Sequence, residues 1–485
     1  MHRCLGKTII MKKILLSLTI CLSTLISNGQ QSVPGDLAQA IRFADIWLEA
    51  QREYDHLPGI SVGIVKDQQL IWSKAYGMAD MNKNVPCEPN TIYSICSISK
   101  LFTSVAIMQL YDAGKLRLDD SVSMLLPGFN IKQQFPGSGP ITVRSLLTHS
   151  SGLPRESDYP YWTGPDYPFP TLPQVVDKLG KQKTLYPAAT YFQYSNLGMT
   201  ILGEIVAKVS GKPYDVYVEE NILKPLRLSS THPYLPADQW GGKFATGYSA
   251  IKRDGTRDVI PLFDARGITA AAGYSSNVED LAHFASWQFR LLKNGGKEIL
   301  KASTLKEMQR VQWVDPDWKT HWGLGFSILQ QDGKTTFGHG GSCPGYRTTL
   351  LIDPQEKLAF VVLINAGASP EKYANGIRNI LLKAKAKEKV SKADSLALES
   401  YAGRYNSQPS GSESHIFPWQ GKLAWIGLPN ERPTEGIIYL KRVQGDTFRR
   451  VRDDETLGEE VIFEKDKSGK VTRLLRHSNY YIKLQ

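Results

Sequence analysis

Hydrophobic residues recur at helical spacing near the start of the chain and then follow the denser pattern of strands. Residues 36–54 carry hydrophobic side chains three or four positions apart on one stripe, which predicts an amphipathic helix. Residues 59–65 and 70–77 are rich in β-forming side chains and are separated by a short polar turn. We therefore expect these two segments to form a hairpin.

A second helical pattern is hydrophobic on most of its faces. It covers residues 97–114, and such a pattern is typical of a helix buried inside a large domain. The segment that follows, about 120–320, mixes loops rich in Pro and Tyr with short helical patterns. We interpret this segment as a mostly helical insertion.

Three strand patterns follow the insertion, at 335–342, 346–353 and 357–365, and a helical pattern resumes at 371–388. The sheet would then take strands from both ends of one unit. This order predicts an α+β domain in which an antiparallel sheet is flanked by helices and accompanied by a mostly helical subdomain. A cleft is expected between the sheet and the helices.

The last part of the chain has a different pattern. Lys-rich residues 383–395 predict a solvated helix end and a linker, and residues 398–485 hold short alternating stretches separated by turn residues. These stretches predict a small antiparallel β domain, either a sandwich or a barrel. The expected organisation is a large domain at 34–388, a linker at 389–397 and the β domain after it.

The N-terminus carries the pattern of a secretory signal peptide, expected to cover residues 1–29. A short positive region at 11–13, which contains Lys12 and Lys13, precedes an apolar run at 14–26, and small residues follow it. The run is shorter than the roughly 20 residues that a membrane span needs. A lipoprotein with Cys21 as its anchor is the less favoured alternative, because bulky Ile20 precedes that cysteine. We expect an exported protein, periplasmic or secreted.

The chain has a formal net charge of +11, which raises the question of a nucleic-acid partner. No nucleic-acid module accompanies this charge, and most of the lysines are scattered along the sequence. We therefore expect no nucleic-acid partner, and at most a peripheral attraction to anionic surfaces of the cell envelope. The oligomeric state is left open.

Of the five cysteines, Cys4 and Cys21 fall in the predicted signal peptide, so Cys87, Cys96 and Cys343 remain. An odd number in an exported protein predicts at most one disulfide and one spare thiol. The spacing of these residues fits no zinc pattern, and no His-Glu-x-x-His occurs. We expect neither a metal nor another cofactor.

The sharpest local motif is Ser-Ile-Ser-Lys at residues 97–100, where the buried helix is expected to begin. A serine hydroxyl is a weak nucleophile that needs a base, and positions three apart lie on one face of a helix. Lys100 can therefore reach Ser97, and burial or a nearby cation would lower the pKa of its amine toward a useful value. Taken alone the motif is weak, because a serine near a helix start is usually a cap.

Two further motifs support a catalytic interpretation of the Ser-Ile-Ser-Lys motif. Tyr194 to Asn196 reads Tyr-Ser-Asn and precedes another apolar helical run. His339 to Ser342 reads His-Gly-Gly-Ser on a predicted strand, where glycines such as Gly341 permit close approach of a substrate to the backbone.

With these three motifs in order, the sequence resembles the serine β-lactamases and penicillin-recognising enzymes, and among them the hydrolases and esterases related to class C β-lactamases. The phrases at 141–154, 273–285 and 321–328 agree, and the resemblance covers about residues 36–388. It implies the β-lactamase/transpeptidase-like fold and chemistry through an acyl-enzyme.

The resemblance also implies a role for each motif residue. Ser97 would attack a carbonyl and become acylated, with Lys100 as the base that takes or shares its proton. Tyr194 would relay protons to the leaving group and from the water that removes the acyl group. Asn196 would hold Lys100 or the amide of the substrate. The backbone N–H groups of Ser97 and Ser342 would form the oxyanion hole.

The third motif departs from the family pattern, because it begins with His339 where relatives usually have Lys. Histidine is mostly neutral at pH 7, so it is a poorer anchor for the carboxylate of a penicillin or a D-Ala-D-Ala peptide. The expected activity therefore shifts from a β-lactamase toward an esterase or a D-amino-acid or D,D-peptidase.

The resemblance also implies a disulfide between Cys96 and Cys343, because some class A β-lactamases carry one at the matching positions. Cys96 precedes the nucleophile and Cys343 follows Ser342. If the two N–H groups bind one oxyanion, these neighbours lie close together. Two buried thiols remain the alternative.

Other residues are expected to be mainly structural. His149 fits a hydrogen-bonded structural histidine, and Trp419 and Trp425 fit the core of the β domain. A cluster of aromatic residues follows His149, and it fits the wall of the cleft as well as the packing of the insertion. The cluster contains Tyr159, Tyr161, Trp162 and Tyr167.

Three functions were compared. A serine hydrolase acting on a small-molecule or peptide ester or amide explains all three motifs. A non-catalytic, penicillin-binding-type receptor for cell-wall fragments would be expected to lack one of Ser97, Lys100 and Tyr194. A metal-dependent hydrolase is disfavoured, because no ligand spacing supports it.

Overall fold

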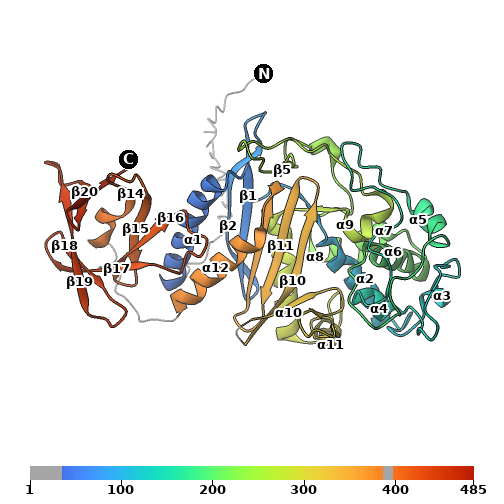
Figure 1. Ribbon diagram of the computed structural model, residues 1–485. Coiled ribbons are helices and arrows are strands. Elements are labelled where there is room, and N and C mark those ends of the chain that lie inside the picture. The colour runs from blue at the N-terminus through green and yellow to red at the C-terminus, as the bar shows by residue number, and fades with distance from the viewer. Residues whose placement is uncertain (1–34, 332, 386–396, 485) are drawn as a thin grey trace, which may run out of the picture. The chain divides into compact units, whose positions relative to one another are not determined.

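The computed structural model describes residues 35–331, 333–385 and 397–484 (Figure 1). The predicted signal peptide and all of the predicted linker except residue 397 lie outside the described residues, so those two expectations stay predictions. Within the described ranges, no helix is both long enough and apolar enough to cross a membrane.

A nine-stranded sheet takes strands from both ends of the large domain, as predicted. The expected hairpin is present, and its first strand pairs with the last long strand of the sheet, Ile60 lying opposite Ile364. In spatial order the strands are β3 (Val85–Pro86), β2 (Gln69–Asp80), β1 (Gly59–Lys66), β12 (Leu358–Ile364), β11 (Tyr346–Asp353), β10 (Lys334–Cys343), β9 (Ser327–Gln331), β8 (His321–Trp322) and β7 (Trp313–Val314).

The sheet is covered by helices on both faces, because alternate side chains of a strand point to opposite sides. Val362 of β12 packs with α1 (Gly35–Tyr54) and α12 (Pro370–Lys385), which confirms the two predicted helices. Its neighbour Val361 packs on the other side. That face is covered by α2 (Ser99–Asp112) and α10 (Val278–Asn294) (Figure 1).

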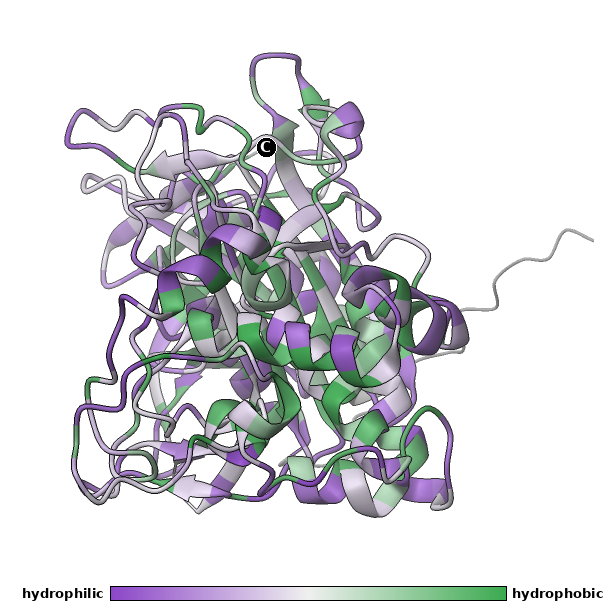
Figure 2. Ribbon diagram, turned by 90° about the vertical axis from the view of Figure 1, so that its right-hand side faces the viewer, coloured by the Kyte–Doolittle hydropathy of each residue, from purple (hydrophilic) through white to green (hydrophobic). Residues whose placement is uncertain are grey.

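The segment between β3 and β7 is mostly helical, and Figure 2 shows hydrophobic residues concentrated in its helices. Its main helix, α6 (Asn196–Ser210), begins where the Ser195 hydroxyl accepts a hydrogen bond from Gly198 N–H. The other helices are α3 (Val122–Leu125), α4 (Val143–Leu147), α5 (Leu172–Leu179), α7 (Tyr214–Val218), the π-helix η1 (Glu219–Leu223), α8 (Lys224–Leu226), the 3₁₀ turns η2 (Ala237–Gln239) and η3 (Arg266–Ile268), α9 (Thr269–Ala272) and α11 (Ala302–Met308).

Short strands complete this domain. β4 (Tyr93–Cys96) pairs with β6 (Tyr274–Ser276), and β5 (Tyr248–Ala250) pairs with β13 (Ala366–Gly367). The pair of β4 and β6 lies directly before α2, so it fixes the point at which the chain enters that helix.

The C-terminal β domain is a closed antiparallel barrel, so of the two architectures left open the barrel is the one observed. The first and last strands pair and close it, and Leu398, Tyr401 and Phe463 belong to its core. The short 3₁₀ turn η4 (Glu399–Tyr401) leads into the barrel. Its strands are β14 (Gly403–Ser407), β15 (Glu413–Trp419), β16 (Lys422–Leu428), β17 (Ile438–Gln444), β18 (Thr447–Val451), β19 (Leu457–Lys465), β20 (Val471–Arg476) and β21 (Asn479–Lys483).

The prediction for the two tryptophans was right for Trp425 and wrong for Trp419. Trp425 belongs to the barrel core, whereas Trp419 packs outside it against Phe43 of α1, with ring centroids 5.5 Å apart. The reason is strand alternation. Ile416 points into the barrel, so Phe417 and Trp419 point to the other face and pack with α1.

The packing of α12 on α1 gives a first prediction. A Cβ atom added at Gly376 would clash with the ring of Trp47, so Gly376→Ala should lower the free energy of unfolding by about 1–3 kcal/mol in urea denaturation. Gly427→Ala is the matched control, because a Cβ atom there meets open space. An equal effect of both substitutions would contradict the tight contact.

Candidate active site

Ser97 lies in a turn between β4 and α2 and not inside the helix, which begins two residues later than predicted. Cys96 takes a φ of 50°, which turns the chain sharply before Ser97. Lys100 N–H then donates to the Ser97 carbonyl at 3.1 Å. Like a helix, this turn brings together side chains three positions apart. The Ser97 hydroxyl and the Lys100 amine are therefore in contact, with Lys100 Nζ 3.0 Å from Ser97 Oγ.

The Lys100 amine is fully buried among three oxygen atoms. Besides Ser97 Oγ, it lies 2.8 Å from Asn196 Oδ1 and 2.7 Å from the carbonyl oxygen of Ala271. Burial lowers the pKa of Lys100 well below its ordinary value; the Arg155 cation lowers it further, and Glu156 acts in the opposite sense.

Burial favours the neutral form of the Lys100 amine. In that form the amine has two N–H donors and one lone pair, and the oxygens of Asn196 and Ala271 can only accept hydrogen bonds. The lone pair of the neutral form is therefore available to the Ser97 hydroxyl. This is the arrangement that a base requires to remove a proton from a serine.

Tyr194 lies beside this pair, immediately before α6. Burial raises the pKa of Tyr194 above its ordinary value, and a hydrogen bond with Ser97 partly offsets that rise. The Lys100 amine and the Arg155 guanidinium face its ring: Lys100 Nζ lies 4.8 Å and Arg155 Cζ 4.9 Å from the ring centroid. The phenol is thus protonated at neutral pH and can donate a proton.

Glu156 is a site residue that the sequence did not reveal. Its Oε1 accepts a hydrogen bond from Asn196 Nδ2 at 2.7 Å, which turns Asn196 Oδ1 toward Lys100. Trp162 Nε1 donates to the same carboxylate at 3.0 Å, and the Tyr161 hydroxyl also donates to it. The available signal was a lone acidic residue before an aromatic cluster, which no motif spacing distinguishes.

The aromatic cluster both packs the helical insertion and lines the cleft, the two roles that the sequence left open. Tyr161 is buried in the insertion, whereas Trp162 and Tyr167 line the cleft at Ser97. Both of these rings also pack on Phe263, at 6.4 and 6.2 Å between centroids. Tyr159 is partly buried against the same core.

His149 is buried and serves the backbone, as expected for a structural histidine. Its Nδ1 accepts a hydrogen bond from Ser195 N–H at 3.2 Å, and its ring lies 4.4 Å from that of Tyr194. Burial lowers the pKa of His149 well below its ordinary value. The neutral ring therefore holds the segment that carries Tyr194.

His339 lies on β10 with its ring 6.1 Å from the ring of Tyr194. Its Nδ1 is 2.6 Å from the carbonyl oxygen of Gly340, which can only accept, so Nδ1 carries the proton. Burial is the largest cause that lowers the pKa of His339, to about 3. His339 therefore brings no positive charge to the site at neutral pH.

The His-Gly-Gly-Ser strand runs close to the segment that carries the nucleophile. A Cβ atom at Gly341 would clash with Thr348 and with the carbonyl oxygen of Ile95, so only glycine fits there. At the end of this strand the structure has the disulfide that the resemblance implied, between Cys96 and Cys343, with Cα atoms 5.7 Å apart. Cys87 is free and buried.

A cleft of about 450 Å³ opens at Ser97 and is hereafter called the cleft. Asn196 and Ser342 line it beside the nucleophile, whereas Tyr194 and His339 do not. Its described lining comprises Ser97, Arg155, Trp162, Tyr167, Asn196, residues 248–250, Ile260, residues 342–345, Arg347 and Gly367.

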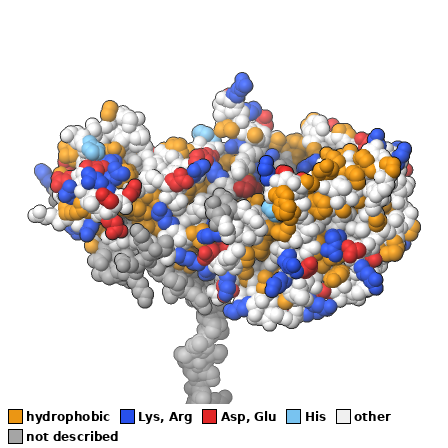
Figure 3. Space-filling view, turned by 60° about the horizontal axis from the view of Figure 1, so that its bottom comes forward, with side chains coloured by type: hydrophobic (Ala, Val, Ile, Leu, Met, Phe, Trp, Pro, Cys, Tyr) orange, Lys and Arg blue, Asp and Glu red, His pale blue; other side chains and the backbone are white. Residues whose placement is uncertain are grey.

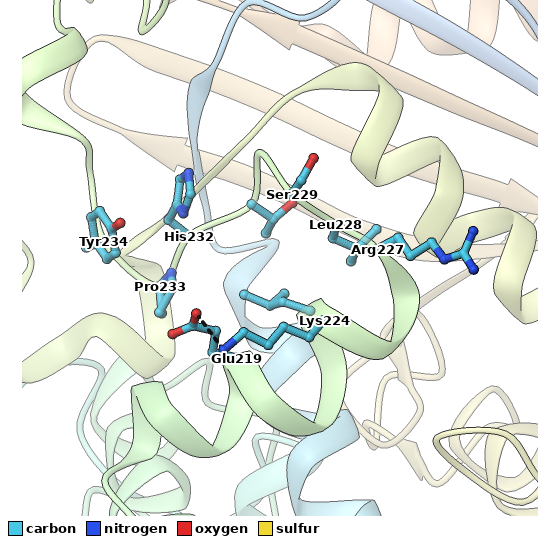
Figure 4. A pocket seen from close by; sticks show the side chains of 10 residues that line it. Glu219, Lys224, Arg227, Leu228, Ser229, His232, Pro233 and Tyr234 are labelled. Carbon is cyan, nitrogen blue, oxygen red and sulfur yellow. Dashed lines mark ion pairs between the residues drawn. The ribbon is translucent and has the colours of Figure 1, made fainter.

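A second hollow, of about 470 Å³, lies next to η1 and contains none of the motif residues (Figure 4). Glu219 and Lys224 form an ion pair in its wall at 3.3 Å, and His232 stacks on Tyr234. The chemistry of the three motifs belongs to the cleft and not to this hollow.

Neither a metal site nor a nucleic-acid-binding surface is evident among the described residues. No group of three or more His, Cys, Asp or Glu side chains gathers there as a metal site would require. On the face drawn in Figure 3, Lys and Arg side chains are interspersed with Asp and Glu and do not form one continuous basic surface.

The fold and this arrangement of serine, lysine and tyrosine define a class of protein, and sequence comparison agrees. The β-lactamase family model matches residues 45–385, so the chain belongs to the β-lactamase family. It has the β-lactamase/transpeptidase fold and carries in addition the C-terminal eight-stranded barrel.

Among curated relatives, Protein flp of Staphylococcus aureus is 29% identical over 66% of this chain. The match spans 62% of that relative's own length. A putative D-alanyl-D-alanine carboxypeptidase of Escherichia coli is 27% identical over 67% of this chain and 82% of its own length.

Among solved structures, an octameric penicillin-binding protein homologue from Pyrococcus abyssi aligns with a TM-score of 0.61 and 25% identity. The alignment covers 92% of this chain and 100% of that one. EstCE1, a hydrolase with promiscuous acyltransferase activity, aligns with a TM-score of 0.60 and 24% identity over 71% of this chain and 99% of its own. That second likeness concerns the fold.

The disulfide predicts a thiol count. In protein produced without residues 1–29 and denatured without reductant, only Cys87 should react with an alkylating reagent, and after reduction all three remaining cysteines should react. Intact-mass measurement distinguishes the two counts. Three reactive thiols without reductant would contradict the bond.

The neutral state of His339 predicts how stability depends on pH. Between pH 3 and 6.5 the unfolded chain binds a proton at this residue that the folded chain does not, so stability falls as the pH is lowered through that window. His339→Asn should reduce this slope by up to about 1.4 kcal/mol per pH unit. Urea unfolding between pH 4 and 6 measures it, with the exposed His477→Asn as control. An unchanged slope in His339→Asn would contradict the buried neutral ring.

Proposed function

We propose that this protein is an exported serine hydrolase that forms an acyl-enzyme on Ser97 and cleaves an ester or an amide. The observation that carries the proposal is the buried Lys100 amine, whose two N–H groups are taken by Asn196 and Ala271. Its lone pair is left for the Ser97 hydroxyl 3.0 Å away. Burial supplies the lowered pKa that a lysine base requires.

The geometry supports the following sequence of steps. Ser97 Oγ attacks the carbonyl carbon while its proton passes to Lys100 Nζ, and the oxyanion is bound by the N–H groups of Ser97 and Ser342. The bond to the leaving group breaks as Tyr194 donates its proton to that group, and Lys100 returns a proton to Tyr194. A water molecule then attacks the acyl-enzyme ester and gives a proton to Lys100 and Tyr194. These two residues return a proton to Ser97 Oγ as the acid leaves.

His339 favours an ester or a D-amino-acid or D,D-peptide substrate over a β-lactam. The family's usual lysine would bring a cation to this side of the site, whereas the pKa of about 3 keeps His339 neutral. The D-alanyl-D-alanine carboxypeptidase name of one relative adds weight to the peptide alternative. A β-lactamase remains the second candidate, because the family model supports it.

Two further parts of the proposal have separate support. Export is supported by the charged and apolar pattern at 11–29 and by the Cys96–Cys343 disulfide, which is typical of oxidising compartments. Catalysis, as opposed to a receptor role, is supported by the contact of both Lys100 and Tyr194 with Ser97.

The test is covalent labelling followed by intact mass. A fluorophosphonate should add one adduct to the wild type, and Ser97→Ala should lose it, with exposed Ser123→Ala as the matched control. Lys100→Met and Tyr194→Phe should lower turnover of 4-nitrophenyl esters by roughly 10³-fold or more, because each removes a proton-transfer group.

The reagents also separate the candidates. Labelling by fluorophosphonate without acylation by a fluorescent penicillin supports the esterase or peptidase, and rapid turnover of the penicillin supports the β-lactamase. No adduct with either reagent in the wild type would contradict Ser97 as the nucleophile.

A further inference from the structure

The charge of the cleft is unusual for a site that must accept a neutral ester or amide bond. Two arginines, Arg155 and Arg347, belong to its described lining, and that lining contains no Asp or Glu. A guanidinium is always charged and favours planar anionic partners such as a carboxylate. The lining of the cleft therefore carries two positive charges and no carboxylate, although Glu156 pairs with Arg155 from outside that lining.

The lining also shows which part of a substrate the cleft holds. Tyr194 is the proton donor to the leaving group, so the leaving group must lie beside Tyr194 and its neighbour His339. Neither residue lines the cleft, whereas Ser97 does. Because its lining includes the nucleophile but neither of the residues beside the leaving group, the cleft fits the acyl part of the substrate.

Arg347 is fixed in a position that suits a carboxylate on that acyl part. It lies directly opposite Ser342 across the pair of β10 and β11, so the two side chains share one face of the sheet. Its Nη1 donates to the carbonyl oxygens of Cys343 and Tyr346, at 2.9 and 2.8 Å. These bonds hold the guanidinium in place. Burial lowers the pKa of Arg347 and the Glu371 charge partly offsets this, but no carboxylate of the described residues is in ion-pair contact with the guanidinium.

Arg155 adds charge but is less free to act as an anchor. Its Nε lies 3.2 Å from Glu156 Oε1, an oxygen that also accepts hydrogen bonds from Asn196 and Trp162. The same cation lowers the pKa of Lys100. Arg155 thus acts on the pKa of Lys100, whereas Arg347 is available to pair with the substrate.

We propose that the natural substrate is an ester or amide of a dicarboxylic acyl group, whose free carboxylate pairs with Arg347. Trp162, Tyr167 and Ile260 supply apolar walls for the chain that joins the two carboxyl groups. An acidic amino acid acylated through one carboxyl group has the same chemistry as a simple diacid. This inference rests on the proposed function, because it needs Ser97 to be acylated.

Matched esters test the substrate class in the wild type. Mono-4-nitrophenyl adipate and 4-nitrophenyl hexanoate have acyl chains of equal length and the same leaving group, and they differ in the terminal carboxylate. We expect kcat/KM to be at least about tenfold higher for the adipate, with the difference mainly in KM, and to see this preference shrink as salt is added. A preference for the hexanoate, or equal rates, would overturn the proposal.

Arg347→Gln then tests the anchor. The ratio of kcat/KM for the adipate to that for the hexanoate should fall by about tenfold, and Arg347→Lys should retain part of the preference, because it keeps the charge but loses the planar fork. Arg117→Gln, an exposed arginine beyond the far end of α2, is the matched control and should leave the ratio unchanged. An equal loss of both activities in Arg347→Gln, with the ratio kept, would overturn the assignment of Arg347.

The two proposals fail in different ways. If Ser97 is not the nucleophile, neither ester is hydrolysed and no fluorophosphonate adduct forms. If only the substrate class is wrong, the adduct forms and the hexanoate is hydrolysed, but the carboxylate gives no advantage. Should Arg347→Gln fail to fold, as judged by circular dichroism, the wild-type ratio and its salt dependence still decide the question.

Discussion

The arrangement around Ser97 depends on one amine whose charged form is disfavoured by burial. Lys100 is fully buried, and burial lowers the pKa of its amine well below the ordinary value. The two carbonyl oxygens that fix the amine come from separate helices, Asn196 at the start of α6 and Ala271 in α9, while Ser97 precedes α2. The site can therefore exist only when these three elements pack together, which links the chemistry directly to the fold.

The segment that carries Ser97 is joined to the sheet by a close approach of the two backbones and by one disulfide. Gly341 lets β10 approach the segment that ends at Cys96, and the disulfide to Cys343 joins residues 247 positions apart in the chain. Both N–H groups of the proposed oxyanion hole, at Ser97 and Ser342, adjoin these cysteines. Around this centre the charges differ by side. His339 is neutral beside Tyr194, whereas Arg155 and Arg347 line the cleft, which does not include His339.

The secondary structure followed closely from local pattern, because periodicity reports burial on one face of each element. The helix at 35–54, the hairpin and the three strands predicted between 335 and 365 lie where the pattern predicted them, whereas the short strands β3, β7, β8 and β9 were not predicted. The prediction that Trp419 belongs to the barrel core was wrong, because alternation along β15 turns its side chain toward α1. The early start predicted for α2 was wrong as well, because the positive φ of Cys96 is a backbone feature that composition does not signal.

The sequence by itself determined the class of this protein, since three short motifs in order and two hydrophobic periodicities are local properties of the chain. It also named Ser97, Lys100, Tyr194 and the pair of cysteines. Only the tertiary structure revealed Glu156 behind Asn196, the neutral tautomer of His339 and the two arginines of the cleft. Burial, hydrogen-bond partners and the sum of charges in a cavity depend on residues that are distant in sequence, and no local pattern encodes them.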